Sequence, residues 1–287
     1  MSNNKNIKKN IVKITSIILC FLLSISLLMT VLFISIGANL SHKSLNKYIV
    51  LSGYSRNLSD KILDKLYNIA DINHIPHEIF DDFVNSSFMT NDIYEYIITM
   101  SQNKKDNKNI IKLNNKKEAL AEKIKNYALN NMELTEGQMQ NLDKNTDELV
   151  DECVLIYQNN MKSVFLEKLY DYSNILNKYF ILISVTLILI DAVIYVTLIF
   201  IQKWKHRGYR YNLYSLTSCE IVMVVSVLYL LVNNIINRLA IVSKELYNFV
   251  VVVLNGVLGG IYIFIIVFAI LIALTAVLYK SKKNNVM

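Results

Sequence analysis

The stretch FVVVVLNGVLGGIYIFIIVFAILIALTAVLY, residues 249–279, contains no charged side chain. An α-helix needs about 20 apolar residues to cross the hydrocarbon core of a bilayer, so this stretch predicts a membrane-spanning helix. Three further stretches have the same character: residues 14–37 carry no charge, residues 179–202 carry only Asp191, and residues 215–236 carry only Glu220. The sequence therefore predicts an all-α integral membrane protein with four transmembrane helices.

The first apolar stretch has two interpretations. The lysines before residue 14 and the run that follows could form a secretory signal peptide, with Ser35-Ile36-Gly37 as a weak cleavage site. The run covers residues 14–37, whereas the apolar part of a signal peptide has about 7–15 residues. Leu19 precedes Cys20, and it is not the small residue that a lipoprotein signal needs. We therefore expect an uncleaved anchor.

Basic residues gather at alternate ends of the four stretches, as the positive-inside rule requires of cytoplasmic segments. They are Lys5, Lys8, Lys9, Lys13, Lys203, Lys205, Arg207, Arg210, Lys280, Lys282 and Lys283. This pattern predicts a multi-pass protein of the cell membrane with both termini in the cytoplasm. The expected order is a cytoplasmic N-terminus (1–13), helix one (14–37), an extracytoplasmic helical domain (38–178), helix two (179–202), a basic cytoplasmic loop (203–214), helix three (215–236), a short outer loop (237–248), helix four (249–279) and a cytoplasmic tail (280–287).

The net charge of +7 does not indicate a nucleic-acid partner. Residues 38–178 hold 17 basic and 20 acidic side chains, so the positive excess lies in the segments that flank the membrane helices. The three cysteines predict no disulfide framework, because Cys20 and Cys219 lie in or beside the membrane and Cys153 is alone in the outer domain. The redox state of Cys153 stays open.

The outer domain has one proline and mostly 3.6-type apolar spacing, which predicts helices. We expect them at about 57–71 behind Ser55 or Ser59 as a cap, briefly after Pro76, at about 91–101 and at about 112–131, with a polar loop at 102–109. Thr135 and Gln138 have the spacing of a capping box. A long helix should follow towards Lys178, with Leu142, Leu149 and Ile156 on one line and a break near residues 158–160.

Charge is unevenly spread within this domain. Residues 104–125 hold eight basic and three acidic side chains, and residues 133–152 hold one basic and seven acidic. These are either two solvated helix faces or two segments that face each other across an antiparallel hairpin closed near residues 130–135. Exposed ion pairs contribute at most about 1 kcal/mol each, so such pairing would set register more than stability.

The runs SGYSRNLSDKILDKLYNIADINHIPHEIFDDFVNSSFMTNDIYEYI and ELTEGQMQNLDKNTDELVDECVLIY resemble a group of uncharacterised membrane proteins of low-GC Gram-positive bacteria. The resemblance covers roughly residues 52–178 and contains no catalytic motif. It implies one anchor, a helical outer domain and three further spans, and it implies no activity.

The stretch NHIPHE, residues 73–78, holds two of the four histidines. His74 and His77, with Asp81, are weak candidates for a metal site. The order H-x-x-H-E differs from H-E-x-x-H and H-x-x-E-H of helical metalloproteases. Pro76 favours the first turn of a helix, which places His74 before the helix and His77 on it. We therefore interpret the stretch as a helix start, and expect no metal or other cofactor.

Asp191 is the strongest anomaly, because a carboxylate near mid-bilayer costs about 2.5–3.5 kcal/mol on insertion scales. It should be protonated or face polar partners inside the bundle; the side chains at similar depth are Ser24, Ser26, Ser226 and Tyr262. Asp191 either relays a proton or cation, or joins helices as a protonated hydrogen-bond donor. Glu220, near the cytoplasmic end of its helix, is expected to reach the interface or pair with Lys203 or Arg210.

Gly256 and Gly260 form a G-x-x-x-G, which predicts close packing against another helix inside the chain or in a second copy. Asn255 is expected to hydrogen-bond across that contact. Enzyme signatures such as a P-loop, G-x-S-x-G, H-E-x-x-H or a paired-cysteine metal motif are absent from the sequence.

These features favour a non-enzymatic membrane protein whose outer domain binds a protein partner or a ligand in the cell envelope, as a receptor, adaptor or accessory subunit. The alternative is a permease-like transporter subunit that works with a separate ATPase. It is suggested by the order of segments along the chain, which is an anchor, an outer domain and three spans. An envelope metal-binding protein using His74 and His77 is the weaker alternative. A homo-oligomer stays open, and the lipid bilayer is the one certain partner of the predicted spans.

Overall fold

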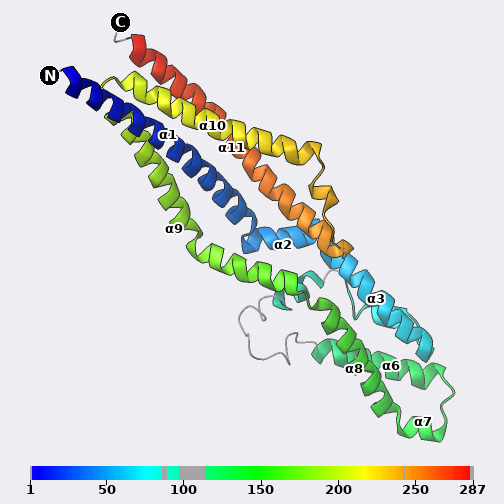
Figure 1. The fold of residues 1–287 in the computed structure, drawn as a ribbon. Coiled ribbons are helices and arrows are strands. Elements are labelled where there is room, and N and C mark those ends of the chain that lie inside the picture. The colour runs from blue at the N-terminus through cyan, green and yellow to red at the C-terminus, as the bar shows by residue number, and fades with distance from the viewer. Residues whose placement is uncertain (1, 86–88, 97–113, 242, 285–287) are drawn as a thin grey trace. The chain divides into compact units, whose positions relative to one another are not determined.

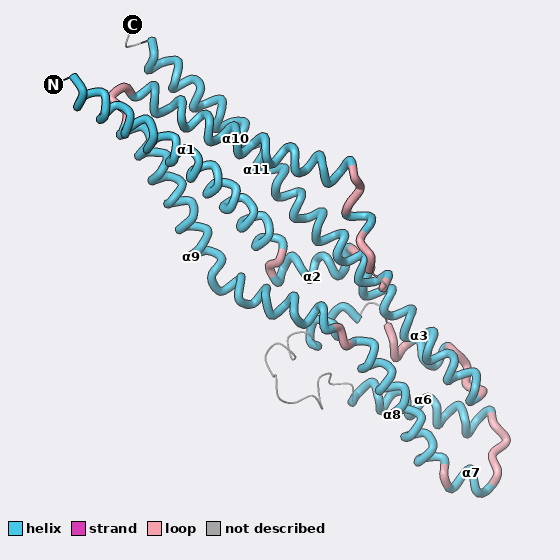
Figure 2. The backbone as a smooth tube through the Cα atoms, in the orientation of Figure 1, coloured by secondary structure: helices cyan, strands magenta, loops and turns pink. Residues whose placement is uncertain are grey.

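The computed structural model describes residues 2–85, 89–96, 114–241 and 243–284, and throughout these residues the regular structure is helical, with no strand (Figures 1 and 2). The chain divides into two compact units. The first, here the membrane unit, comprises residues 1–45, 175–240 and 251–287. The second, here the helical domain, comprises residues 46–174 and 241–250. The predicted all-α class is confirmed for the described residues.

Among the described residues, four helices are long and apolar enough to cross a membrane, in agreement with the predicted number of spans. They are α1 (Ser2–Asn39), α9 (Val164–Ile201), α10 (Lys205–Val232) and α11 (Lys244–Asn284). Helices α1 and α11 extend beyond both ends of their predicted apolar stretches, whereas α9 and α10 begin earlier than predicted and end at Ile201 and Val232, short of residues 202 and 236. The prediction of a cytoplasmic loop over residues 203–214 is wrong in its length: α10 begins at Lys205, and only residues 202–204 interrupt the helices.

The turn between α9 and α10 brings the two helices into backbone contact. A Cβ atom on Gly208 would lie 2.5 Å from Ile199 Cα and 2.6 Å from the Leu198 carbonyl oxygen. Glycine is therefore required here for close approach rather than for an unusual backbone angle. This contact lets α10 fold directly back along α9.

The directions of the helices follow from the residues that pair. Ser24 donates to the Ser215 carbonyl and the Cys20 thiol to the Tyr211 carbonyl, each across 191 residues, so α1 and α10 run parallel. Gln202 near the end of α9 donates to Ser16 near the start of α1, so these two helices are antiparallel. The unit is therefore an up-and-down bundle, as four successive spans require.

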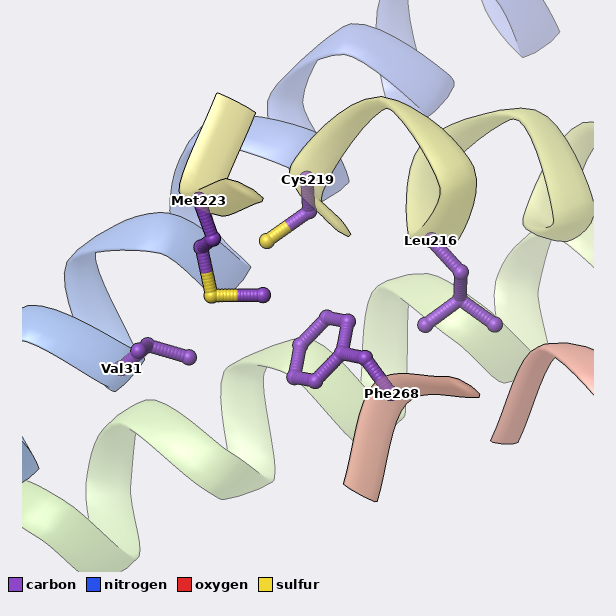
Figure 3. Packing of buried hydrophobic residues seen from close by; sticks show 5 residues of the cluster. All are labelled: Val31, Leu216, Cys219, Met223 and Phe268. Atoms are coloured by element: carbon purple, nitrogen blue, oxygen red, sulfur yellow. The ribbon is translucent and has the colours of Figure 1, made fainter. Parts of the chain in front are cut away.

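An apolar cluster joins the bundle in its middle (Figure 3). It consists of Val31 from α1, Leu216, Cys219 and Met223 from α10, and Phe268 from α11. Most other apolar side chains of the four spans face outwards, as expected where the surrounding medium is lipid.

The helical domain is built from shorter helices: α2 (His42–Leu51), of which residues 46–51 belong to this unit, α3 (Tyr54–Asn73), α4 (Glu78–Asp81), a helical stretch at 89–96, α6 (Asn114–Asn131), α7 (Glu136–Gln140) and α8 (Leu142–Met161). A 3₁₀ turn, η1 (Ile236–Arg238), lies in the membrane unit. The predicted polar loop at 102–109, residues 97–101 of the predicted 91–101 helix and the first two residues of the predicted 112–131 helix lie outside the described residues.

Helix α3 begins differently from the prediction. Gly53, with a φ of 66°, precedes it in the left-handed conformation that glycine adopts at little cost. Ser55 and Ser59 lie inside the helix and do not cap it; Ser59 instead donates to the Val84 carbonyl at 3.1 Å and is buried. The predicted serine cap is therefore wrong, because the serine hydroxyl found a tertiary partner.

The capping box at Thr135 and Gln138 is confirmed: the Thr135 hydroxyl accepts from the Gln138 backbone N–H, and the Gln138 side chain accepts from that of Thr135. The long helix expected to follow is divided into α7, α8 and α9. The break lies at residues 162–163 rather than at 158–160.

The buried face of α8 is also different from the predicted one. It consists of Thr146, Val150, Cys153, Tyr157 and Met161, whereas Leu142, Leu149 and Ile156 are half-buried. The line of Leu142, Leu149 and Ile156 lies beside the contact face rather than on it. Apolar spacing alone did not find that face, because a polar threonine and a tyrosine belong to it.

Helices α6 and α8 form an antiparallel hairpin, which is one of the two interpretations of the uneven charge distribution. Lys117 pairs with Asp151 at 2.5 Å, and Lys125 pairs with Asp143 nearer the closed end. Each step of eight residues along α6 thus matches a step of eight backwards along α8. The interpretation of facing charged segments is therefore confirmed for this part of the hairpin.

We expect Gly208→Ala to destabilise the membrane unit by about 1–3 kcal/mol, because its Cβ would meet backbone atoms that cannot move aside. The measurement is the midpoint of thermal denaturation in detergent, followed by circular dichroism. Gly259→Ala is the matched control, since nothing lies within 4 Å of that position. Equal midpoints for the two variants would contradict the close contact of α9 with α10.

Candidate functional site

A small open pocket lies on the helical domain between α4 and α6, with a volume of about 190 Å³. Its walls are apolar, and charged or polar side chains form the rest of its lining. The lining residues are Ile79, Phe83, Ala119 and Leu120 among the apolar ones, and Asp82, Asn115, Lys116 and Lys123 among the polar ones. We call it the α4–α6 pocket. Lys123 forms an ion pair with Asp82 across it.

A buried polar network supports one side of this pocket. Tyr157 is fully buried and donates its hydroxyl hydrogen to Asp92, and Lys116 lies 2.5 Å from the same Asp92 oxygen. Lys116 Nζ also lies 5.3 Å from the centre of the Tyr157 ring. Burial, and then the hydrogen bond to Asp92, raise the pKa of Tyr157 far above its usual range, so it stays a neutral donor. The network holds Lys116 in place at the pocket.

The NHIPHE stretch is a helix junction in the structure. His74, with a φ of 54°, ends α3 in the left-handed conformation, and its N–H donates to the Ala70 and Asp71 carbonyls. His77 precedes α4 and pairs with Asp71 at 2.8 Å. A helix does start here, but it begins at Glu78 and has only four residues, so the placement of His77 on the helix is wrong. Phe80, Phe83 and Val84 are buried, and Ile79 is half-buried in the pocket wall.

The candidate metal residues are engaged elsewhere. The His77 ring stacks on Tyr67 with centres 4.2 Å apart, and the Tyr67 hydroxyl donates to Asp81. That hydrogen bond, and then burial, raise the pKa of Tyr67 to about 12. His74 is exposed and belongs to no cluster with His77 and Asp81: no group of three His, Cys, Asp or Glu that could hold a metal occurs in the part of the chain that the structure describes.

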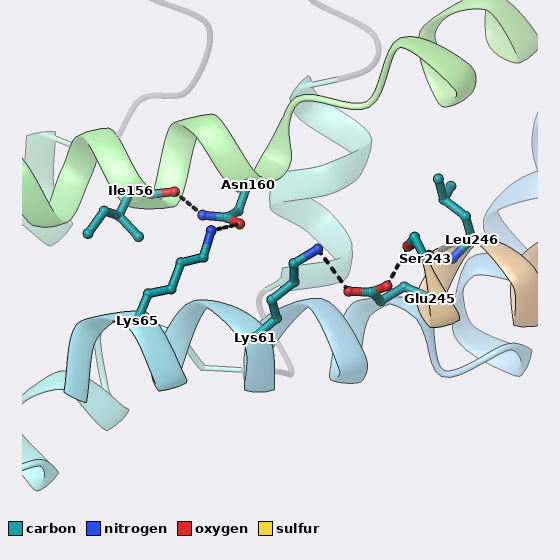
Figure 4. A network of polar contacts seen from close by, with 7 residues as sticks. All are labelled: Lys61, Lys65, Ile156, Asn160, Ser243, Glu245 and Leu246. Atoms are coloured by element: carbon teal, nitrogen blue, oxygen red, sulfur yellow. Dashed lines mark hydrogen bonds and ion pairs between the residues drawn. The ribbon is translucent and has the colours of Figure 1, made fainter. Parts of the chain in front are cut away.

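A second polar network ties residues 243–246 to α3 inside the helical domain (Figure 4). Lys61 pairs with the buried Glu245 at 3.2 Å, and Ser243 donates to the other Glu245 oxygen. Lys65 donates to Asn160 at 2.8 Å and so joins α3 to α8. Residues 241–250, part of which the sequence presented as a short outer loop, are thus an integral part of this domain.

In the membrane unit, Asp191 is 7% exposed and faces α1. Its Oδ2 lies 2.7 Å from Thr30 Oγ1, and Oδ1 has no hydrogen-bond partner among the described residues. The predicted partners are therefore wrong in detail. Ser24 pairs with Ser215 instead, Ser26 contributes only its carbonyl to Thr30, and Ser226 and Tyr262 are exposed.

Asp191 belongs to a polar seam between α1 and α9. Ser16 pairs with Gln202, Thr30 with Asp191, and the buried hydroxyls of Ser35 and Ser184 find no hydrogen-bond partner among the described residues. Sequence inspection singled out the charge but not this seam, because serine and threonine hardly interrupt an apolar run. The sequence does not show the antiparallel register of α1 and α9, which brings these side chains together.

The other acidic and basic side chains of the spans lie apart from one another. Glu220 is half-buried on α10, and within the described residues no ion pair joins it to Lys203 or Arg210. Lys203 lies over the Trp204 ring at 5.6 Å, and Arg210 over the Tyr211 ring at 5.8 Å. The expected pairing of Glu220 is therefore not observed.

The glycine motif of α11 makes a close contact at Gly260. A Cβ on Gly260 would lie 3.1 Å from Ser35 Cβ of α1, so this glycine lets α11 and α1 approach. Gly256, one turn earlier, is half-buried. Asn255 is exposed and makes no hydrogen bond to a described residue, which differs from the cross-helix bond expected of it.

The residues missed by sequence inspection are those of the α4–α6 pocket and of the Tyr157 network. Asp92 and Lys116 are 24 positions apart and Tyr157 is 65 positions from Asp92, so no local pattern joins them. The one available signal was tyrosine at the spacing of Thr146, Val150 and Cys153, which marks it as part of a buried face.

Comparison of the chain with protein-family models, with curated proteins and with solved structures gives no match.

We expect the Cys153 thiol to be inert in the folded protein. It is fully buried, and burial, followed by the charge of Glu152, raises its pKa to about 12, so little thiolate exists near neutral pH. A maleimide should label it at least about a hundredfold more slowly than an Asn126→Cys variant, whose added thiol lies on the exposed face of α6. Peptide mass spectrometry measures both rates. Rapid native labelling of Cys153 would contradict this burial.

Proposed function

We propose that the protein is a non-enzymatic, multi-pass membrane protein whose helical domain lies outside the cytoplasm and binds a protein partner in the cell envelope. The four long helices would anchor that domain. The α4–α6 pocket is the observation that carries the proposal, because it is a defined apolar recess bordered by the charged side chains of Asp82, Lys116 and Lys123.

The size of the pocket favours a protein partner over a small ligand. Pockets for drug-sized molecules have volumes of about 300–1,000 Å³ and enclose most of the ligand. The α4–α6 pocket, at about 190 Å³ and open to solvent, fits a single apolar side chain. Interfaces between proteins commonly rest on such an anchor, surrounded by polar contacts. Lys116, Lys123 and Asp82 would supply that polar surround.

The distribution of charge supports an external domain. The end of α9, the start of α10 and the end of α11 lie together, since His206 and Tyr279 have ring centres 6.4 Å apart. Lys203, Lys205, Arg207, Arg210, Lys280, Lys282 and Lys283 are concentrated at that end. The positive-inside rule assigns such an end to the cytoplasm. The termini would then be cytoplasmic.

A permease-like transporter subunit is the second candidate, and the observation that favours it is Asp191 with its polar seam. Buried ionisable groups within spans often mark a path for ions or substrates. The chain carries no P-loop, so such a subunit would need a separate ATPase. In the adaptor function, Asp191→Asn should leave partner binding intact.

The orientation predicts which thiols an impermeant maleimide reaches on intact cells. Asn126→Cys, on exposed α6, should be labelled without permeabilisation, and Lys205→Cys, at the exposed start of α10, only after it. The unsubstituted chain is the control for the native cysteines. The reverse pattern would place the helical domain in the cytoplasm and contradict the proposal.

The binding function predicts site-specific photo-cross-linking in cells. Benzoylphenylalanine at Ala119, in the pocket wall, should give an adduct of defined mass with a partner protein. The same group at Leu129, which is 47% exposed on α6 but outside the pocket, is the matched control. Mass spectrometry identifies the adducts. Equal yields at both positions, or none at Ala119, would count against the pocket as the binding site.

A further inference from the structure

The one acidic side chain buried inside the membrane unit, Asp191, has no use in partner binding. It is 7% exposed, and it lies on the face of α9 that packs against α1. The apolar stretches at 14–37, 179–202, 215–236 and 249–279 contain no lysine, arginine or histidine. No basic side chain within the spans can therefore neutralise this carboxyl group.

The surroundings of Asp191 are neutral on every helix that packs near it. From α1 comes Thr30, whose hydroxyl does not titrate in water. From α10 comes Cys219, which lies near Asp191 and near Glu220, the other acidic residue within the spans. On α9 itself Tyr195 follows one turn later, and its hydroxyl pairs with Thr275 of α11 at 3.1 Å. Each neighbouring titratable group is thus acidic or neutral, and none supplies a positive charge to pair with the carboxyl group.

Counting hydrogen bonds decides between the two forms of the carboxyl group. A carboxylate has four acceptor sites and needs several donors when it is buried. Asp191 has one hydroxyl neighbour, and Oδ1 has no hydrogen-bond partner among the described residues. A neutral acid needs one acceptor for its single hydrogen, and an unpaired carbonyl oxygen is the less costly omission.

Thr30 can supply that acceptor. Its hydroxyl lies 3.0 Å from the Ser26 carbonyl, one turn back in α1, as well as 2.7 Å from Asp191 Oδ2. A hydroxyl has one hydrogen and two lone pairs. When Thr30 donates to the Ser26 carbonyl, its lone pair can accept a hydrogen from Asp191, and the hydrogens of both hydroxyl groups then have acceptors.

We propose that Asp191 is a proton-binding site in the membrane interior, where its carboxyl group is held as the neutral acid and donates from Oδ2 to Thr30 across the seam of α1 and α9. The ligand of this site is a proton rather than a metal cation, because one hydroxyl and one carboxyl group supply too few oxygens to replace a hydration shell.

Carbodiimide labelling of the full chain in liposomes tests the site. Dicyclohexylcarbodiimide takes the proton of a carboxylic acid onto nitrogen while the carboxylate oxygen bonds to its central carbon. The O-acylisourea formed then rearranges to a stable N-acylurea, with no other reactant. We expect a single adduct at Asp191 that diminishes as the pH is raised and is unchanged when sodium replaces N-methylglucamine at equal ionic strength. Absence of the adduct, or protection by sodium, overturns the proposal.

Matched variants and a spectroscopic readout separate this site from general reactivity. Asp191→Asn should lose the adduct, whereas Glu220→Gln should keep it. Infrared spectra of the chain with carbon-13-labelled aspartate should show the carbonyl band of a protonated acid, and Thr30→Val should shift that band to higher frequency as its hydrogen bond is lost. The adduct and the infrared band of the unsubstituted chain test the proposal even if the Asp191→Asn variant fails to fold. A carboxylate band in its place overturns the proposal.

Discussion

A polar group carried into a bilayer must find its partner inside the protein, and the membrane unit is organised by that constraint. Its apolar side chains face outwards in large number, while serine, threonine, asparagine and aspartate lie among the buried ones. The Ser215 hydroxyl, for example, lies within hydrogen-bond distance of three acceptors: the Cys20 carbonyl, the Cys20 thiol and the Tyr211 carbonyl. The hydrophobic effect cannot hold helices together in lipid, so such contacts and close backbone approach at Gly260 and Gly208 do so.

The helical domain is organised differently, with its apolar side chains gathered in a core. Its core is large and apolar, with Phe80, Leu66 and Ile62 fully buried, and its charges meet in pairs at the surface. The pairs along α6 and α8 each contribute little, but a slip of one turn would separate all of them at once. The contact of the buried Tyr157 with the half-buried Asp92 and Lys116 adds to the same packing, since a partly desolvated hydrogen bond is stronger than one in water.

Much of the fold could be predicted from composition and period, and the reasons are physical. Four long apolar runs with at most one charged side chain each indicate membrane spans, and Thr135 with Gln138 needs only local chemistry to form its capping box. The failures lie where a distant partner overrides a local preference. Ser59 hydrogen-bonds to the Val84 carbonyl instead of capping α3, and Val150 rather than Leu149 lies on the buried face of α8. Residues 205–214 are helical because a membrane span does not end where its apolar side chains end.

The same distinction separates what could be known of the site. Asp191 is visible in the sequence as a lone charge in an apolar run, yet its partner Thr30 stands 161 positions away and looks like an ordinary span residue. The α4–α6 pocket gives no signal in the sequence, since its walls come from two separate parts of the chain and each wall residue is of a common type. A motif search finds chemistry carried by neighbours in the chain, and here the chemistry is carried by neighbours in space.

The contact of Gly208 with the backbone of α9 bears on how the chain is made. Only residues 202–204 separate the two helices, and Gly208 already touches Ile199. As the ribosome delivers α10, the connection is too short for that helix to wander from α9 in the plane of the membrane. The two helices should therefore leave the translocon together, as a hairpin that is closed at residues 202–204.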